Sequence, residues 1–96
     1  MFQLSTEPPE FTQRPVDQNI VEGHSAFFSC DANGEPLPSI SWTKDGQPVT
    51  NQRRHTVNPS GTTLSIMRVQ PSDAGVYACV AAIGASNRQV TARLTV

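Results

Sequence analysis

The amino-acid sequence predicts an all-β domain built as a two-sheet antiparallel β-sandwich. Short stretches in which apolar and polar residues alternate recur along the 96 residues. Clusters of Gly, Pro, Asn and Asp separate these stretches, and no stretch repeats its apolar residues at helical spacing. Short strands with frequent turns indicate a sandwich, because each half-apolar sheet must bury one face against another layer.

The expected strands follow a linker at residues 1–9 and form a single domain at residues 10–96. In chain order they cover residues 10–13, 16–21, 25–32, 39–44, 47–50, 54–58, 62–67, 75–83 and 88–96. The linker ends in Pro8-Pro9, which favour an extended backbone. Pro15 separates the first two strands. Because proline cannot donate a ladder hydrogen bond, the first strand should lie at a sheet edge and pairing should resume on the other sheet.

Side-chain alternation indicates the third and fourth strands, and a turn signal indicates the fifth. Residues two apart lie on the same face, so Phe28 and Cys30 point inward together in the third strand, as do Ile40 and Trp42 in the fourth. Asp45-Gly46 is a two-residue turn signal, and it predicts a tight hairpin from the fourth strand into the short fifth.

The second half of the chain continues the same alternation. Pro59-Ser60-Gly61 closes the sixth strand, residues 68–74 form a corner ahead of the eighth, and a last turn at 84–87 precedes the ninth. The remaining residues expected to face inward are Ala26, Leu64, Ile66, Val69, Tyr77, Cys79, Ala81, Ile83, Ala92, Leu94 and Val96.

A few motifs resemble one known family. Tyr77 stands two positions before Cys79, and Trp42 lies in the strand that follows Cys30. With the runs 34–36, 42–46 and 73–79, this pattern resembles the intermediate (I-set) class of the immunoglobulin superfamily, most closely modules of peroxidasin and other extracellular adhesion and receptor proteins. The resemblance implies one inter-sheet disulfide, Cys30–Cys79, with Trp42, Tyr77 and Leu64 as hallmark core residues.

The resemblance also implies an ion pair and raises a question about the last turn. Asp73 is expected to form a partly buried structural ion pair with Arg54. Members of the class usually carry Asn and Gly after the second cysteine where this chain has Ile83 and Ser86. We therefore expect Gly84 or Asn87 to supply the positive φ angle that this turn needs.

Composition and charge exclude several classes of function. A formal net charge of −1 gives no general attraction to nucleic acid or to an anionic membrane. No run approaches the ~20 apolar residues that cross a bilayer, so we expect no direct membrane insertion. The start Met1-Phe-Gln-Leu lacks the basic head and apolar middle of a signal peptide. We interpret Met1 as an added initiator on an excised module. The disulfide that the resemblance implies would require an oxidising compartment.

No catalytic residue, cofactor or metal site is predicted. The Ser, His and Asp residues are scattered over turns and strand ends, and no nucleophile or phosphate-loop motif is present. Both cysteines are assigned to the disulfide, and His24 and His55 are far apart and expected to be exposed. Arg53, Arg54 and His55 form the one basic cluster. It could contact a heparin-like glycan, or it could be a solvated strand edge.

The outward side of the fourth and eighth strands is the more promising surface for contact with protein. Its expected members are Ser41, Thr43, Val76, Ala78, Val80 and Ala82. They carry no charge, as at the centres of protein interfaces, although Ala and Val in strands also serve pleat packing alone.

Two functions fit these features. The first is a non-catalytic protein-binding or adhesion module of an extracellular or cell-surface protein, which contacts neighbouring immunoglobulin domains, its own copies or other proteins. The alternative is a structural spacer in an intracellular muscle or actin-associated filament, where thiols are generally reduced.

Overall fold

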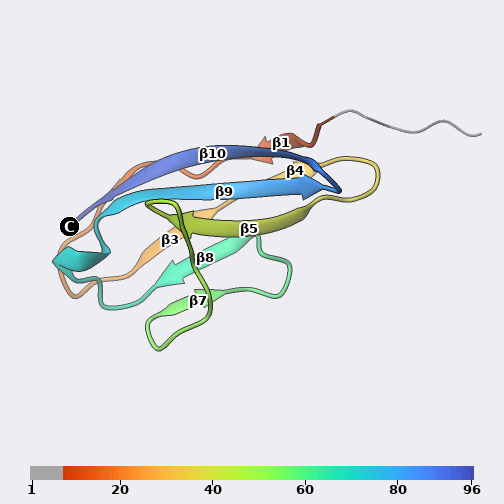
Figure 1. The fold of residues 1–96 in the computed structure, drawn as a ribbon. Coiled ribbons are helices and arrows are strands. Elements are labelled where there is room, and N and C mark those ends of the chain that lie inside the picture. Colours follow the sequence, from red (N-terminus) through yellow and green to blue (C-terminus); the bar gives the residue numbers. More distant parts are fainter. Residues whose placement is uncertain (1–7) are drawn as a thin grey trace, which may run out of the picture.

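A computed structural model describes residues 8–96 and shows two packed β-layers (Figure 1). One layer has the strand order β2-β10-β9-β5-β6, and the other contains the two-stranded sheet β1-β4 and the three-stranded sheet β3-β8-β7. The strands are β1 (Glu10–Gln13), β2 (Gln18–Asn19), β3 (Ala26–Ser29), β4 (Asp31–Asn33), β5 (Ser39–Lys44), β6 (Gln47–Pro48), β7 (His55–Val57), β8 (Thr63–Ile66), β9 (Gly75–Ile83) and β10 (Ser86–Thr95). The predicted two-sheet sandwich is confirmed.

The chain changes partner twice at the edges of the layers. The expected strand at 25–32 is two strands, because pairing passes from β8 to β1 at Cys30, whose N–H donates to Thr62 O at 2.9 Å. At the N-terminal edge, β1 pairs with β4 in one layer, and after Pro15 the chain crosses to pair β2 in parallel with β10 in the other. The crossing that Pro15 predicts is therefore present.

Several strand ends differ from the predicted ones by one to a few residues. β2, β6, β7 and β8 are shorter than expected, and β10 begins two residues earlier. The expected turn at 84–87 is only Gly84-Ala85, because Ser86 already pairs with Ile83. Gly84 has φ +57°, whereas Asn87 lies in β10, so Gly84 supplies the positive φ. The Asp45-Gly46 hairpin is present, with φ angles of 49° and 85°.

The core lies between the layers around the disulfide that joins Cys30 to Cys79. Trp42 is 2% exposed beside it, and its indole Nε1 donates to Gly61 O at 2.7 Å, so the ring's one polar group is satisfied. Phe28 stacks on Tyr77 with ring centroids 5.2 Å apart. The other buried members of the core are Ala26, Leu64, Ile66, Val69, Ala92 and Leu94. Ile40, Ile83 and Val96 are only half-buried.

Pro9 extends the domain by one residue beyond the predicted boundary. Its side chain is fully buried, and its carbonyl accepts a 3.5 Å hydrogen bond from Arg88. Pro9 therefore packs with the domain, and residues 1–7 of the expected linker (residues 1–9) lie outside the described residues. In residues 8–96 no helix is long and apolar enough to span a membrane.

Candidate functional site

The first candidate is the outward side of β5, β9 and β10, which we call the outward face. Its centre consists of two rows of cross-strand neighbours. Ser41, Val80 and Gln89 form one row, and Thr43, Ala78 and Thr91 form the other. None of these residues is charged. Because directly opposed side chains in a sheet lie about 5 Å apart, the rows form a continuous uncharged surface.

Exposure is uneven across the outward face. Val76, Val80 and Ala82 are half-buried, as is Thr43, whereas Ser41 is exposed. Ala78 is only 6% exposed, because its single methyl group lies between the longer Thr43 and Thr91 in neighbouring strands. Ala78 therefore points outward, as expected, but offers little surface of its own in the free domain.

The second candidate lies at the corner before β9, where several donors meet the buried carboxylate of Asp73. Arg54 donates twice, from Nη1 to Oδ2 at 2.7 Å and from Nη2 to Oδ1 at 3.1 Å. The backbone N–H of Gln70 donates to Oδ2 at 2.7 Å. His55 Nε2 lies 3.6 Å from Oδ1. Two-pronged pairing of this kind is the strongest that a guanidinium makes with a carboxylate.

The same corner is fixed by a second hydrogen bond from the core. The Tyr77 hydroxyl donates to the Asp73 carbonyl at 2.6 Å, and Tyr77 is fully buried. Burial raises the pKa of Tyr77, and the nearby Asp73 charge raises it further, so the hydroxyl remains a donor. These contacts attach the short helical turn Pro71–Asp73 to both β7 and β9.

Burial and the neighbouring charged groups shift the pKa values of Asp73, Arg54 and His55 in opposite directions. Burial alone would raise the pKa of Asp73, but the hydrogen bonds from Arg54 and from the Gln70 backbone outweigh it and hold the pKa below its ordinary value. The hydrogen bond to Asp73 raises the pKa of Arg54. Burial lowers the pKa of His55 more than the neighbouring Asp73 raises it. At neutral pH the corner therefore contains a paired carboxylate and a neutral imidazole.

The predicted basic cluster is not one exposed patch. Arg54 and His55 both turn toward Asp73, and their side chains are 19% and 15% exposed. Of the three, only Arg53 is exposed. The expectation that both histidines are exposed is correct for His24 and wrong for His55, because the sequence does not show that β7 lies beside the Asp73 corner.

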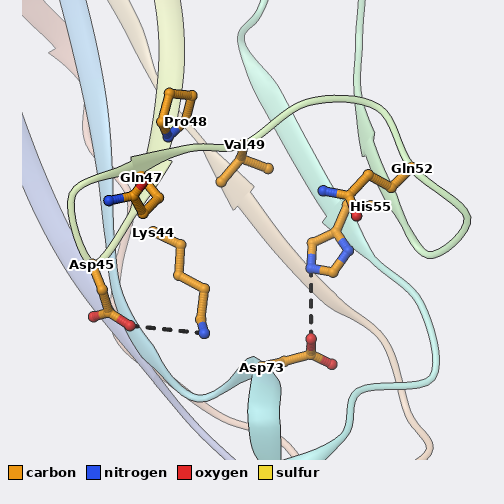
Figure 2. Close-up of a pocket in the computed structure, with 8 residues that line it drawn as sticks. All are labelled: Lys44, Asp45, Gln47, Pro48, Val49, Gln52, His55 and Asp73. Carbon is orange, nitrogen blue, oxygen red and sulfur yellow. Dashed lines mark ion pairs between the residues drawn. The ribbon is translucent and has the colours of Figure 1, made fainter.

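A pocket of about 360 Å³ opens beside this corner, between the edges of the two layers (Figure 2). Its lining residues are Lys44, Asp45, Gln47, Pro48, Val49, Gln52, His55 and Asp73. Lys44 and His55 project into it from the two layers, and Val49 lies between them (Figure 2). This pocket was not predicted from the sequence. One available signal was Lys44, which shares the inward parity of Ile40 and Trp42 at the end of β5.

Lowering the pH should reduce the stability of the fold in two stages, and His55 causes the stage at higher pH. The folded state lowers the pKa of His55 below 6.5, so the unfolded chain binds its proton first and stability falls as pH drops through 6.5. Asp73 contributes stability above its ordinary 3.8 that is lost as pH falls further. For His55→Gln we expect urea unfolding to show little change between about pH 7.5 and about pH 5.5, the range in which histidine titrates.

Over this range the free energy of unfolding of the wild type should fall by well under ~1.4 kcal/mol, the amount that corresponds to a shift of one pKa unit, because the ring is only partly shielded from solvent. The exposed His24 offers a matched control, and His24→Gln should retain the wild-type pH dependence. Equal pH dependence in His55→Gln and the wild type would contradict this assignment.

The geometry offers no catalytic arrangement in the described region. Asp73 is fully engaged by Arg54 and Gln70, and no hydroxyl lies in hydrogen-bond contact with His55. Residues 8–96 contain no group of three or more His, Cys, Asp or Glu side chains that could hold a metal ion.

Comparison with known proteins defines the class and then the family. Human peroxidasin homolog is 43% identical over 88 residues, which are 92% of this chain and 6% of that protein. The Ig1-2 module of the Drosophila receptor tyrosine phosphatase DLAR superimposes with a TM-score of 0.87 at 39% identity, covering 93% of this chain and 48% of that one. Titin domain M7 gives a TM-score of 0.81 at 29% identity, covering 92% of each chain.

These relatives place the chain among the immunoglobulin-like domains of multi-domain proteins, and it spans only a small part of the curated relatives that it matches. The profile of the immunoglobulin I-set domain matches residues 9–96. The chain belongs to the immunoglobulin I-set family. The predicted family is confirmed, and domains of this fold are generally non-catalytic.

Proposed function

We propose that the chain is a non-catalytic protein-binding module of an extracellular or cell-surface protein, and that the outward face makes the contact. The observation that carries this proposal is the uncharged centre formed by the rows through Val80 and Ala78. Charged residues are depleted at interface centres because their desolvation is costly. The face is also rigid, since β9 pairs along its length with β10 and β5.

Edge-to-edge pairing is less well supported than contact through a face. At β7, Asn51 Oδ1 accepts the N–H of Val57, and Gln52 N–H donates to His55 O. At β6, Pro48 has no N–H to donate. Both edges on this side of the sandwich therefore offer few free ladder groups, and natural sheets use such devices to prevent edge pairing.

The partner class that we propose is another immunoglobulin domain, including a second copy of this chain. Two outward faces with uncharged centres meet without like-charge repulsion at those centres, and tandem modules would add avidity to a weak contact. The disulfide between Cys30 and Cys79 supports an oxidising, extracellular location.

Val80→Glu should abolish association while leaving the fold intact, because it places a charge at the centre of the outward face. We expect light scattering after size exclusion to show the wild-type mass rising with micromolar concentration and the Val80→Glu mass remaining that of a monomer. Ser65→Glu is the matched control, since Ser65 is half-buried on the other layer beside Phe27. If Val80→Glu associates as the wild type does, the outward face does not make the contact between copies.

The alternative is a spacer in an intracellular filament, and the likeness to titin M7 over 92% of both chains favours it. The two functions differ in the redox state of Cys30 and Cys79. Thiol titration of the unfolded protein from its native compartment, without reductant, should find no free thiol for an extracellular module. Two free thiols would favour the filament spacer.

A further inference from the structure

The pocket beside Asp73 contains more hydrogen-bond donors than it uses. Lys44 Nζ donates to Ser72 O at 2.9 Å and lies 3.7 Å from Asp45 Oδ2, too far for a second hydrogen bond. An ammonium group has three N–H donors, so two of those on Lys44 lack a partner among residues 8–96. The Lys44 side chain is 29% exposed, and its amine points into the pocket (Figure 2).

His55 faces the same space from the opposite layer. Its ring makes no hydrogen bond within the described residues, and Asp73 Oδ1, at 3.6 Å, is beyond that range. Gln47 and Gln52 also line the pocket. The groups with unused hydrogen-bonding capacity within residues 8–96 thus include an ammonium and an imidazole.

Both carboxylates of the pocket already accept hydrogen bonds from other residues. Asp73 is held by two hydrogen bonds from Arg54 and one from Gln70. Asp45 accepts from Val76 N at 3.0 Å, and its side chain is 54% exposed. The charges of Lys44 and Arg54 balance those of Asp45 and Asp73, so the pocket is neutral when His55 is neutral and carries one positive charge when His55 is protonated.

We propose that this pocket binds a single carboxylate, presented by an aspartate or glutamate side chain of a partner protein, between Lys44 and His55. The volume of about 360 Å³ lies at the small end of ligand pockets and suits one side chain. Val49 and Pro48 supply apolar surface for the methylene groups of the entering residue. The site is separate from the outward face and does not depend on its function.

Binding should strengthen as pH falls. The charged groups that face His55 are Asp73 from the corner, its neighbour Arg54, and Lys44 from β5. An entering carboxylate adds a negative charge beside the imidazole, so binding and protonation favour each other. Lys44 should attract the carboxylate at every pH, whereas His55 should add to the affinity only when protonated.

NMR titration with N-acetyl-glutamate amide tests the site, with N-acetyl-glutamine amide as the uncharged isostere. We expect amide and His55 ring shifts at the pocket with the glutamate probe alone. Its affinity should be roughly threefold or more higher at about pH 5.5 than at about pH 7.5, and the His55 titration should move to higher pH.

Three variants separate the roles of the two residues. Lys44→Gln should weaken binding of the glutamate probe at both pH values, whereas Lys44→Arg should keep most of the wild-type affinity. His55→Gln should keep the weak affinity at about pH 7.5 and lose the gain at lower pH. Dispersed amide spectra of each variant check that it is folded. Equal shifts with both probes, absence of shifts at the pocket, or full affinity in Lys44→Gln would overturn the proposal.

Discussion

Replacing Cys30 and Cys79 together by Ala should lower the free energy of unfolding by about 4 kcal/mol, a large share of the stability of a small domain. The disulfide closes a loop across a sequence separation of 49 and so restricts the unfolded chain. Both residues are fully buried, so the loss of two sulfur atoms beneath Trp42 adds a packing cost. Urea unfolding of the double variant and the wild type measures the difference.

Reducing the disulfide of the wild type separates the contribution of the cross-link to stability from that of the packing, because both sulfur atoms remain in place. We expect reduction to account for most of the loss and the Ala substitutions to add a smaller part. A reduced wild type as stable as the oxidised protein would contradict the disulfide's role. It would also favour the filament function, since such a domain must remain folded without the cross-link.

Asp73→Ala should destabilise the domain by about 3 kcal/mol, because it removes the common acceptor of Arg54 and the Gln70 N–H. Arg54 keeps long contacts to the carbonyls of Met67 and Arg68, both at 3.3 Å, which limits the cost. The Tyr77 hydroxyl also keeps its acceptor, the backbone carbonyl of residue 73.

A double replacement tests whether the cost comes from the orphaned cation. Arg54→Met combined with Asp73→Leu should be more stable than Asp73→Ala, because replacing both partners of a buried pair by apolar groups leaves no unpaired charge. Thermal unfolding of the single and double variants gives the comparison. A loss under about 1 kcal/mol for Asp73→Ala, the size of an exposed ion pair, would show that the pair contributes no more than a surface contact.

Most of the fold could be predicted because its determinants are local. Alternation in the strand that holds Tyr77 and Cys79 predicted both ends of β9, and Asp45-Gly46 predicted the hairpin. The split of the strand at Cys30 could not be predicted, because it depends on which distant strand pairs with each half. Alternation specifies the face of a residue, but it does not specify the pairing partner.

The candidate sites were predicted less completely, for the same reason. The resemblance implied the Arg54–Asp73 pair, and the structure brings the two residues together. The pocket could not be predicted, because it depends on distant parts of the chain. It forms where β6 and β7, at the edges of different layers, approach the Asp73 corner. Neither the partial burial of His55 nor the shielding of Ala78 appears in the sequence pattern.

The most direct test of the proposed function is a map of backbone amide shifts as the isotope-labelled domain is concentrated toward the millimolar range. Contact through the outward face predicts concentration-dependent shifts at Val76–Ala82 of β9 and at their neighbours in β5 and β10. Shifts that cluster around Phe27 and Ser65 on the other layer, or spectra that do not change with concentration, would contradict contact between copies of this chain through the outward face.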